Sequence, residues 1–130
     1  MSVRLALALA LVAVMVTPAT AGSVHCTKVG TAQADQIIGG PTRDVICAHR
    51  GSDYAIGNGG GDVVRGGKGS DTLVGGDGAD VIQGRSGDDD LFASDGHPGD
   101  TLVGGDGRDR CYGDVGDSFV ECEHTVRVKT

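Results

Sequence analysis

Aspartate recurs at a nearly constant interval of nine residues through most of this 130-residue chain. The series with the best surrounding pattern is Asp53, Asp62, Asp71, Asp80, Asp89, Asp100 and Asp109, and Asp35 and Asp44 extend it upstream. If successive units stack, these carboxylates lie close together and repel each other unless a cation lies between them. Calcium accepts several oxygen ligands in irregular geometry, whereas magnesium demands a tighter octahedron. The spacing therefore predicts several Ca²⁺ ions, bound by these aspartates together with backbone carbonyls.

The aspartates belong to a nine-residue unit, G-G-x-G-x-D-x-U-x, in which U is a large aliphatic residue. Two consecutive copies read Gly66-Gly-Lys-Gly-Ser-Asp71-Thr-Leu73-Val and Gly75-Gly-Asp-Gly-Ala-Asp80-Val-Ile82-Gln. In this frame, ten units cover residues 30–121, with a two-residue insertion at His97-Pro98 and Ser118 in place of the last aspartate. A period of this length is typical of a stacked repeat architecture.

This motif resembles the calcium-binding repeat of RTX proteins. The chain also resembles small exported calcium-binding proteins that carry such repeats with cysteines near both ends. The resemblance implies an all-β fold, the parallel β-roll, which is a right-handed β-solenoid. It also implies calcium ions along both edges of the roll. Known RTX proteins often join the repeats to a protease, lipase or toxin domain, and no such domain fits in this chain.

Each unit is expected to form a six-residue turn and a three-residue strand, with two units per coil. Since side chains alternate along a strand, the eighth position should point inward. The expected interior is Ile37, Ile46, Ala55, Val64, Leu73, Ile82, Leu91, Leu102, Cys111 and Val120. The outward positions are mixed in character and predict no aromatic cluster. The aspartates outside position six are expected to face solvent, namely Asp77, Asp88, Asp90, Asp95, Asp106, Asp114 and Asp117.

The ends of the chain suggest export. Arg4 precedes an apolar run over residues 5–16, and Ala19-Thr-Ala21 offers small residues for cleavage, which predicts a signal peptide over 1–21 and a secreted, extracellular protein. A capping segment over 22–29, the repeats over 30–121 and a tail over 122–130 would follow. Four cysteines predict two disulfides in an oxidising compartment, namely Cys26, Cys47, Cys111 and Cys122. Three connectivities are possible, and pairing within each end is favoured because a stack keeps its ends apart.

Composition excludes several function classes. Aromatic residues make up 3% of the chain, Gly numbers 24 and the net charge is -7, which disfavours a deep catalytic pocket and a nucleic-acid partner. No catalytic motif occurs, so no enzyme is expected, and no membrane association is expected after leader cleavage.

Two alternatives to a plain calcium-binding protein stay open: an adhesion or interaction module with a partner at the cell envelope, and an accessory factor to a separate secreted hydrolase. Ordering so much glycine around a thin core is costly, so folding should depend on calcium.

Overall fold

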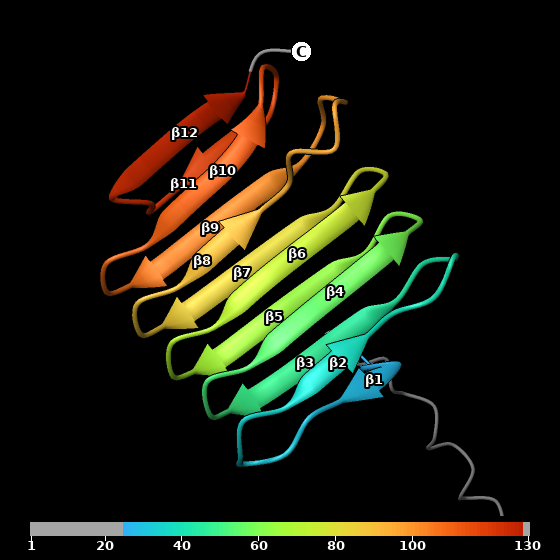
Figure 1. The fold of residues 1–130 in the computed structure, drawn as a ribbon, viewed down its shortest axis with the longest axis vertical. Helices are drawn as coiled ribbons and strands as arrows, with labels where there is room; N and C mark the ends of the chain where they lie inside the picture. Colours follow the sequence, from blue (N-terminus) through green and yellow to red (C-terminus); the bar gives the residue numbers. More distant parts are fainter. Residues whose placement is uncertain (1–24, 129–130) are drawn as a thin grey trace, which may run out of the picture.

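The computed structural model describes residues 25–128 as an all-β solenoid built from two parallel six-stranded sheets (Figure 1). The predicted signal peptide over 1–21 lies outside the described residues. The chain alternates between the sheets, so strands with odd numbers form one sheet and strands with even numbers the other. We call these the odd sheet and the even sheet. The prediction of an all-β parallel β-roll is confirmed.

The odd sheet contains β1 (Lys28–Val29), β3 (Val45–Arg50), β5 (Val63–Lys68), β7 (Val81–Ser86), β9 (Thr101–Asp106) and β11 (Ser118–Val120). The even sheet contains β2 (Gln36–Ile38), β4 (Tyr54–Gly59), β6 (Thr72–Asp77), β8 (Asp90–Phe92), β10 (Arg110–Asp114) and β12 (His124–Val128). Among residues 25–128, no helix is long and apolar enough to cross a membrane.

Neighbouring strands pair in register at the length of one coil. Leu73 pairs with Ala55 and Val81 with Val63, which are separations of two nine-residue units. Across the insertion, Val81 pairs with Thr101, two residues later than the repeat alone would give. The extra residues lie in the long turn between β8 and β9, so the ladder continues on both sides of it. The insertion predicted at His97-Pro98 therefore has the expected effect on register.

The central strands are twice as long as expected. They run for six residues rather than three, because the glycine pair that opens the next unit continues the strand, as in β6 with Gly75 and Gly76. Gly76 still pairs with Asn58 in the neighbouring strand, although its φ is +102°. The turn between two strands is correspondingly shorter than six residues.

The interior is a thin double layer of aliphatic side chains. Nine of the ten predicted inward residues are buried, and Ala48 and Ala93 join them at the positions where other units have their first glycine. The prediction for Val120 is wrong, because its side chain is 45% exposed. The last unit is one residue shorter than the others, so Phe119 pairs with Leu102 and packs against the core instead.

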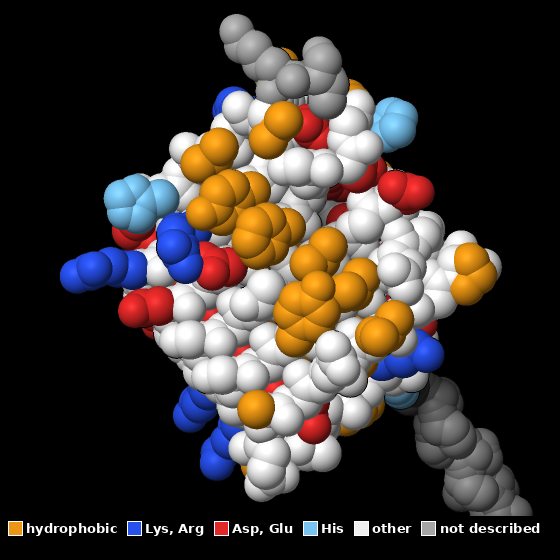
Figure 2. Space-filling model, viewed as in Figure 1, with side chains coloured by type: hydrophobic (Ala, Val, Ile, Leu, Met, Phe, Trp, Pro, Cys, Tyr) orange, Lys and Arg blue, Asp and Glu red, His pale blue; other side chains and the backbone are white. Residues whose placement is uncertain are grey.

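The outer face of the even sheet carries an apolar row that the sequence analysis did not expect. Register places one outward residue from each strand in a continuous line, which we call the apolar row: Ile38, Ile56, Val74, Phe92, Tyr112 and Val126. The rings of Phe92 and Tyr112 are stacked, with centroids 4.7 Å apart. Figure 2 shows apolar side chains gathered across this face of the molecule. The expectation of no aromatic cluster was therefore wrong, because residues far apart in sequence meet here.

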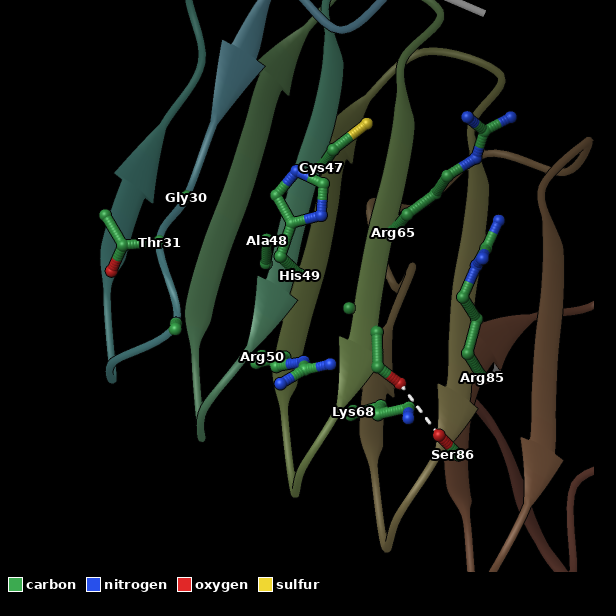
Figure 3. Close-up of a pocket in the computed structure, with 13 residues that line it drawn as sticks. Gly30, Thr31, Cys47, Ala48, His49, Arg50, Arg65, Lys68, Arg85 and Ser86 are labelled. Atoms are coloured by element: carbon green, nitrogen blue, oxygen red, sulfur yellow. Dashed lines mark hydrogen bonds between the residues drawn. The ribbon is translucent and has the colours of Figure 1, made fainter.

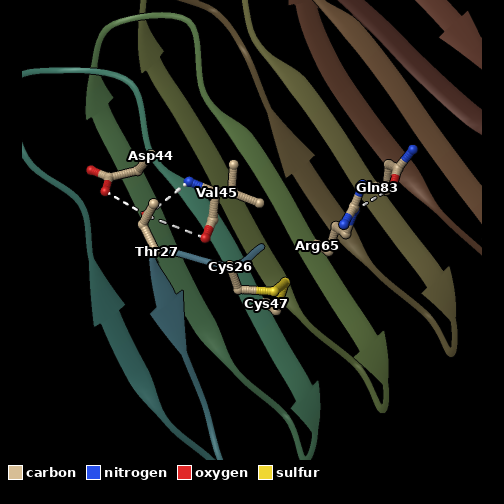
Figure 4. Close-up of a disulfide and its surroundings, with 7 residues drawn as sticks. All are labelled: Cys26, Thr27, Asp44, Val45, Cys47, Arg65 and Gln83. Atoms are coloured by element: carbon tan, nitrogen blue, oxygen red, sulfur yellow. Dashed lines mark hydrogen bonds between the residues drawn. A yellow bond between two sulfur atoms is a disulfide. The ribbon is translucent and has the colours of Figure 1, made fainter. Parts of the chain in front are cut away.

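Two disulfides close the ends of the stack. Cys26 is bonded to Cys47 in β3, and Cys111 in β10 is bonded to Cys122. These are the local pairs favoured among the three connectivities, and Figure 4 shows the first of them beside β3. At the other end, Arg127 in β12 lies over the Phe119 ring, 4.5 Å from its centroid, and its Nη1 donates to the carbonyl oxygens of Asp114 and Asp117.

Close contact between coils leaves no room for a Cβ on Gly67, the second residue of its unit. Gly67 has φ +125°, and a Cβ there would lie 1.9 Å from the carbonyl oxygen of His49. We expect Gly67→Ala to lower the free energy of unfolding by about 2–5 kcal/mol, since backbone strain and overpacking add. Thermal or urea unfolding in calcium-containing buffer measures this loss.

The matched control is Gly40→Ala, at the same position of an earlier unit. A Cβ on Gly40 would have Asp44 Oδ2, at 3.7 Å, as its nearest neighbour, and this contact is ordinary. Its unfolding free energy should stay within about 0.5 kcal/mol of wild type, as for an unconstrained substitution. Equal losses for the two variants would contradict the close packing of coils.

Candidate metal centre: two columns of stacked aspartates

The sixth-position aspartates form two columns, one at each edge of the roll. The first column contains the aspartates that precede the even-sheet strands: Asp35, Asp53, Asp71, Asp89 and Asp109. The second column contains those that precede the odd-sheet strands: Asp44, Asp62, Asp80 and Asp100. All nine predicted site residues thus fall into the two expected stacks.

One hydrogen bond repeats along both columns. The backbone N–H of each aspartate donates to Oδ1 of the aspartate one coil later, as from Asp53 to Asp71 and from Asp62 to Asp80. The seven donor–acceptor distances between column aspartates lie between 2.7 and 2.9 Å. Each carboxylate is thereby held in a fixed orientation against the preceding coil.

The second carboxylate oxygen is buried and lacks any hydrogen-bond partner within the described chain. This holds for Oδ2 of seven residues, Asp53, Asp62, Asp71, Asp80, Asp89, Asp100 and Asp109. In several units the first glycine makes room for that atom; a Cβ on Gly66 would lie 2.3 Å from Asp71 Oδ2. Buried polar atoms are nearly always paired, so a whole series of unpaired carboxylate oxygens indicates a missing partner.

Asp35 and Asp44, in the first coil, differ from the other seven. Asp44 Oδ2 accepts a hydrogen bond of 2.7 Å from the Gly40 N–H. Its Oδ1 accepts one of 2.8 Å from the Thr27 hydroxyl (Figure 4). These bonds, that from Gly40 foremost, lower the pKa of Asp44. The oxygens of Asp35 are bonded to Thr31 in the same way. Protein donors therefore stabilise the ionised form of Asp44 and occupy the oxygens of Asp35.

Burial has the opposite effect on the other seven. Loss of water raises the pKa of Asp80 to about 6 and the pKa values of Asp89 and Asp100 to about 7, and repulsion by stacked carboxylates adds to the shift. The pKa values of Asp53, Asp62, Asp71 and Asp109 are raised as well, mainly by burial. Two rows of buried acids whose ionised form is disfavoured call for a cation or a proton.

Two carboxylates that were not predicted as site residues from the sequence end the two columns. Asp117 Oδ1 accepts the N–H of Asp100 at 3.0 Å, and Glu123 Oε2 accepts the N–H of Asp109 at 2.8 Å. Asp117 therefore holds the place assigned to Ser118, and its expected exposure to solvent is wrong. The signal was present: Asp117-Ser118-Phe119 repeats the D-x-U spacing, after a turn one residue short.

Other off-column aspartates divide between solvent and local contacts. Asp77, Asp88 and Asp106 are exposed, as predicted. The prediction of exposure is wrong for Asp114, which is buried and accepts the Gly96 N–H at 2.7 Å. It is also wrong for the side chain of Asp95, which is 4% exposed. Both serve the long turn around the insertion, whose backbone N–H groups need acceptors.

The donor set fits calcium. The partnerless atoms are carboxylate oxygens, which are the hard ligands that Ca²⁺ prefers, and no cysteine competes because all four are in disulfides. Within residues 25–128, no three His, Cys, Asp or Glu side chains surround a common point. An ion in these columns would therefore need backbone carbonyls beside the carboxylates, which is compatible with the six to eight ligands that Ca²⁺ takes.

Comparison with known proteins gives one positive result. Neither the curated proteins nor the solved structures contain a match to this chain. A family model described as RTX calcium-binding nonapeptide repeat matches four times, over residues 29–55, 65–97 and 99–120. These segments make up more than half of the chain and include most of both columns. The chain therefore belongs to the family of RTX calcium-binding nonapeptide repeat proteins.

Proposed function

We propose that this chain is a secreted, non-enzymatic protein whose two aspartate columns bind several calcium ions, and that the ions drive its folding. The observation that supports this most directly is the set of seven buried Oδ2 atoms without a partner. The calcium-binding character of the repeat family supports the choice of ion.

The ligands we assign are Asp53, Asp62, Asp71, Asp80, Asp89, Asp100 and Asp109, with backbone carbonyls of the adjacent turns. A divalent cation beside two stacked carboxylates replaces their mutual repulsion by attraction to a shared charge. For Asp35 and Asp44, calcium binding stays a prediction, because existing hydrogen bonds occupy their oxygens. Their role without an ion is to satisfy the turns of the first coil.

Secretion fits this function. The two disulfides indicate an oxidising environment. The predicted leader over residues 1–21 would direct the chain out of the cell, where extracellular modules bind calcium with dissociation constants of about 10⁻⁴–10⁻³ M. A chain whose carboxylates repel each other without calcium would stay unfolded until export and fold on binding.

The apolar row favours a second candidate, a calcium-stabilised interaction module at the cell envelope. Its residues are spread over six strands, so only the assembled solenoid presents them as one surface. Contiguous apolar surface on a small soluble protein often marks an interaction site.

A calcium titration tests the proposed function. The oxidised protein, freed of calcium by dialysis, should change from a coil to a β spectrum in far-UV circular dichroism when calcium is added, and magnesium at equal concentration should fail. Asp80→Asn keeps the Oδ1 acceptor but removes the charge, and should weaken calcium binding about tenfold or more, because affinity depends on ligand charge. Asp77→Asn, an exposed aspartate of the same unit, should bind like wild type.

The Asp80→Asn variant also separates a calcium ligand from a purely structural residue. Without calcium it should be more folded than wild type, since a buried charge has been removed; with calcium it should be less stable. A variant that is destabilised equally in both conditions would contradict the assignment of Asp80 as a ligand.

Proton binding should partly substitute for calcium. The raised pKa values mean that, from about pH 4 to 7, the folded protein binds more protons than the unfolded chain. The free energy of unfolding of the calcium-free protein should therefore fall as pH rises through this window. The folded fraction of the calcium-free protein, from far-UV circular dichroism at pH 5 and pH 7.5, measures it. The stabilisation due to calcium should show the opposite trend, because calcium displaces the protons. A calcium-free protein that is more stable at pH 7.5 would overturn this linkage.

The envelope candidate has its own test. Sedimentation with washed cell envelopes should retain the calcium-loaded protein and release it in chelator, and Phe92→Thr with Tyr112→Thr should abolish retention while leaving calcium-induced folding intact. Retention that survives in the double variant, or no retention of wild type, would exclude the apolar row as the interaction site.

A further inference from the structure

A basic pocket lies on the outer face of the odd sheet. Its positive charge contrasts with the acidic turns that carry the aspartate columns. Its volume is about 690 Å³, and β3, β5 and β7 supply its charged lining, namely His49, Arg50, Arg65, Lys68 and Arg85. Figure 3 shows these side chains around the pocket, with those of Arg50 and Lys68 next to each other. A protein with a net charge of -7 thus gathers cationic groups on one surface.

Strand register brings like charges together there. Arg50 is the direct partner of Lys68, and such cross-strand pairs of equal charge are unfavourable. Among residues 25–128 the only ion pairs are Arg110 with Asp90 and His97 with Asp95, so no carboxylate forms an ion pair with the pocket cations. In the row of Arg50 and Lys68, the first carboxylate is Asp106, two strands beyond Lys68.

Arg65 is already oriented for binding. Its Nε donates to Gln83 Oε1 at 3.1 Å, and register makes Arg65 and Gln83 direct partners on β5 and β7. Its two terminal nitrogens make no hydrogen bond within the described chain. An arginine held through one nitrogen keeps the rest of its planar fork for a ligand, and that fork matches the geometry of a phosphate.

Two of the four non-glycine residues with positive φ in the described chain line this pocket. His49 and Arg85 have φ values of +82° and +87°, although both stand at the second position of a unit, where Gly67, Gly76 and Gly105 occur elsewhere. Bulky residues rarely adopt this conformation, and such strain is concentrated at functional sites. At both places a cationic side chain replaces the glycine that suits the backbone, and both side chains line the pocket.

We propose that this pocket binds a small ligand carrying two phosphate groups. The cations are spread too widely for a single phosphate: Arg65 and Lys68 are three residues apart on β5, or about 10 Å between Cα atoms. The pocket volume suits a small molecule. A long polyanion fits less well, because it would run onto the exposed carboxylates of Asp88, after β7, and Asp106, at the end of β9. The cationic side chains of this site are not among the assigned calcium ligands, so the proposal goes beyond the proposed function.

Isothermal titration of the calcium-loaded, oxidised protein tests the proposal, with fructose 1,6-bisphosphate as probe and free calcium matched in both solutions. We expect saturable one-to-one binding in 150 mM NaCl, and binding about tenfold or more weaker for fructose 6-phosphate, which lacks one charge-assisted contact. No saturable binding of the bisphosphate would overturn the proposal. Equal binding of the two sugars would overturn the two-phosphate assignment.

Arg85→Gly is the decisive variant, because it removes a cation and restores the residue that the backbone prefers. It should fold at least as well as wild type and bind the bisphosphate about tenfold or more weakly. Asn58→Gly is its matched control: Asn58 has the same φ of +82° at the same position of its unit, but lies on β4 of the even sheet. The control should bind like wild type. Undiminished binding by Arg85→Gly, or an equal loss in Asn58→Gly, would overturn the proposal.

Discussion

The hydrogen bond from one aspartate N–H to the carboxylate of the next coil is the interaction on which the rest of the structure depends. It fixes the distance between coils at each edge, as between Asp71 and Asp89, where the bond is 2.8 Å long. Each aspartate in the middle of a column donates through its backbone N–H to the next coil and accepts through its carboxylate from the preceding coil. The same aspartate therefore ends one turn and anchors the next, and the stack grows by repeating a single contact.

This arrangement has an electrostatic cost that a bound cation would offset, and the proposed dependence on calcium rests on it. Holding Oδ1 against the backbone leaves Oδ2 buried without a partner in seven carboxylates, and burial raises the pKa values of Asp89 and Asp100 to about 7. The interior is thin and its inward side chains include Ala48, Ala55 and Ala93, which bury little apolar surface against that cost. At the two ends of the columns, the protein itself supplies hydrogen-bond partners for these groups. Hydroxyl and backbone donors satisfy Asp44, whereas Asp117 and Glu123 accept the last free N–H groups.

The two sheets share one backbone plan and carry different outer surfaces. On the even sheet, the last position of each unit is apolar, which produces the apolar row with the Phe92–Tyr112 stack. On the odd sheet, the equivalent position holds Arg65 and Gln83 and the pocket is basic. Because units alternate between sheets, residues nine apart in sequence belong to different faces and residues one coil apart to the same face. A solenoid can thus present two unrelated surfaces from one repeat.

The period of nine by itself determined the all-β solenoid, the two aspartate columns and nearly all of the core. It could do so because every residue contacts copies of itself one coil away, so local spacing specifies the long-range contacts. Register at the ends was decided only in the tertiary structure. There, a turn one residue short moved Phe119 inward and Val120 outward, and gave Asp117 the position assigned to Ser118. The pairing of the cysteines and the surfaces of the two sheets were likewise decided by folding. They depend on which side chains become neighbours across strands, and net charge and composition contain no information about neighbours.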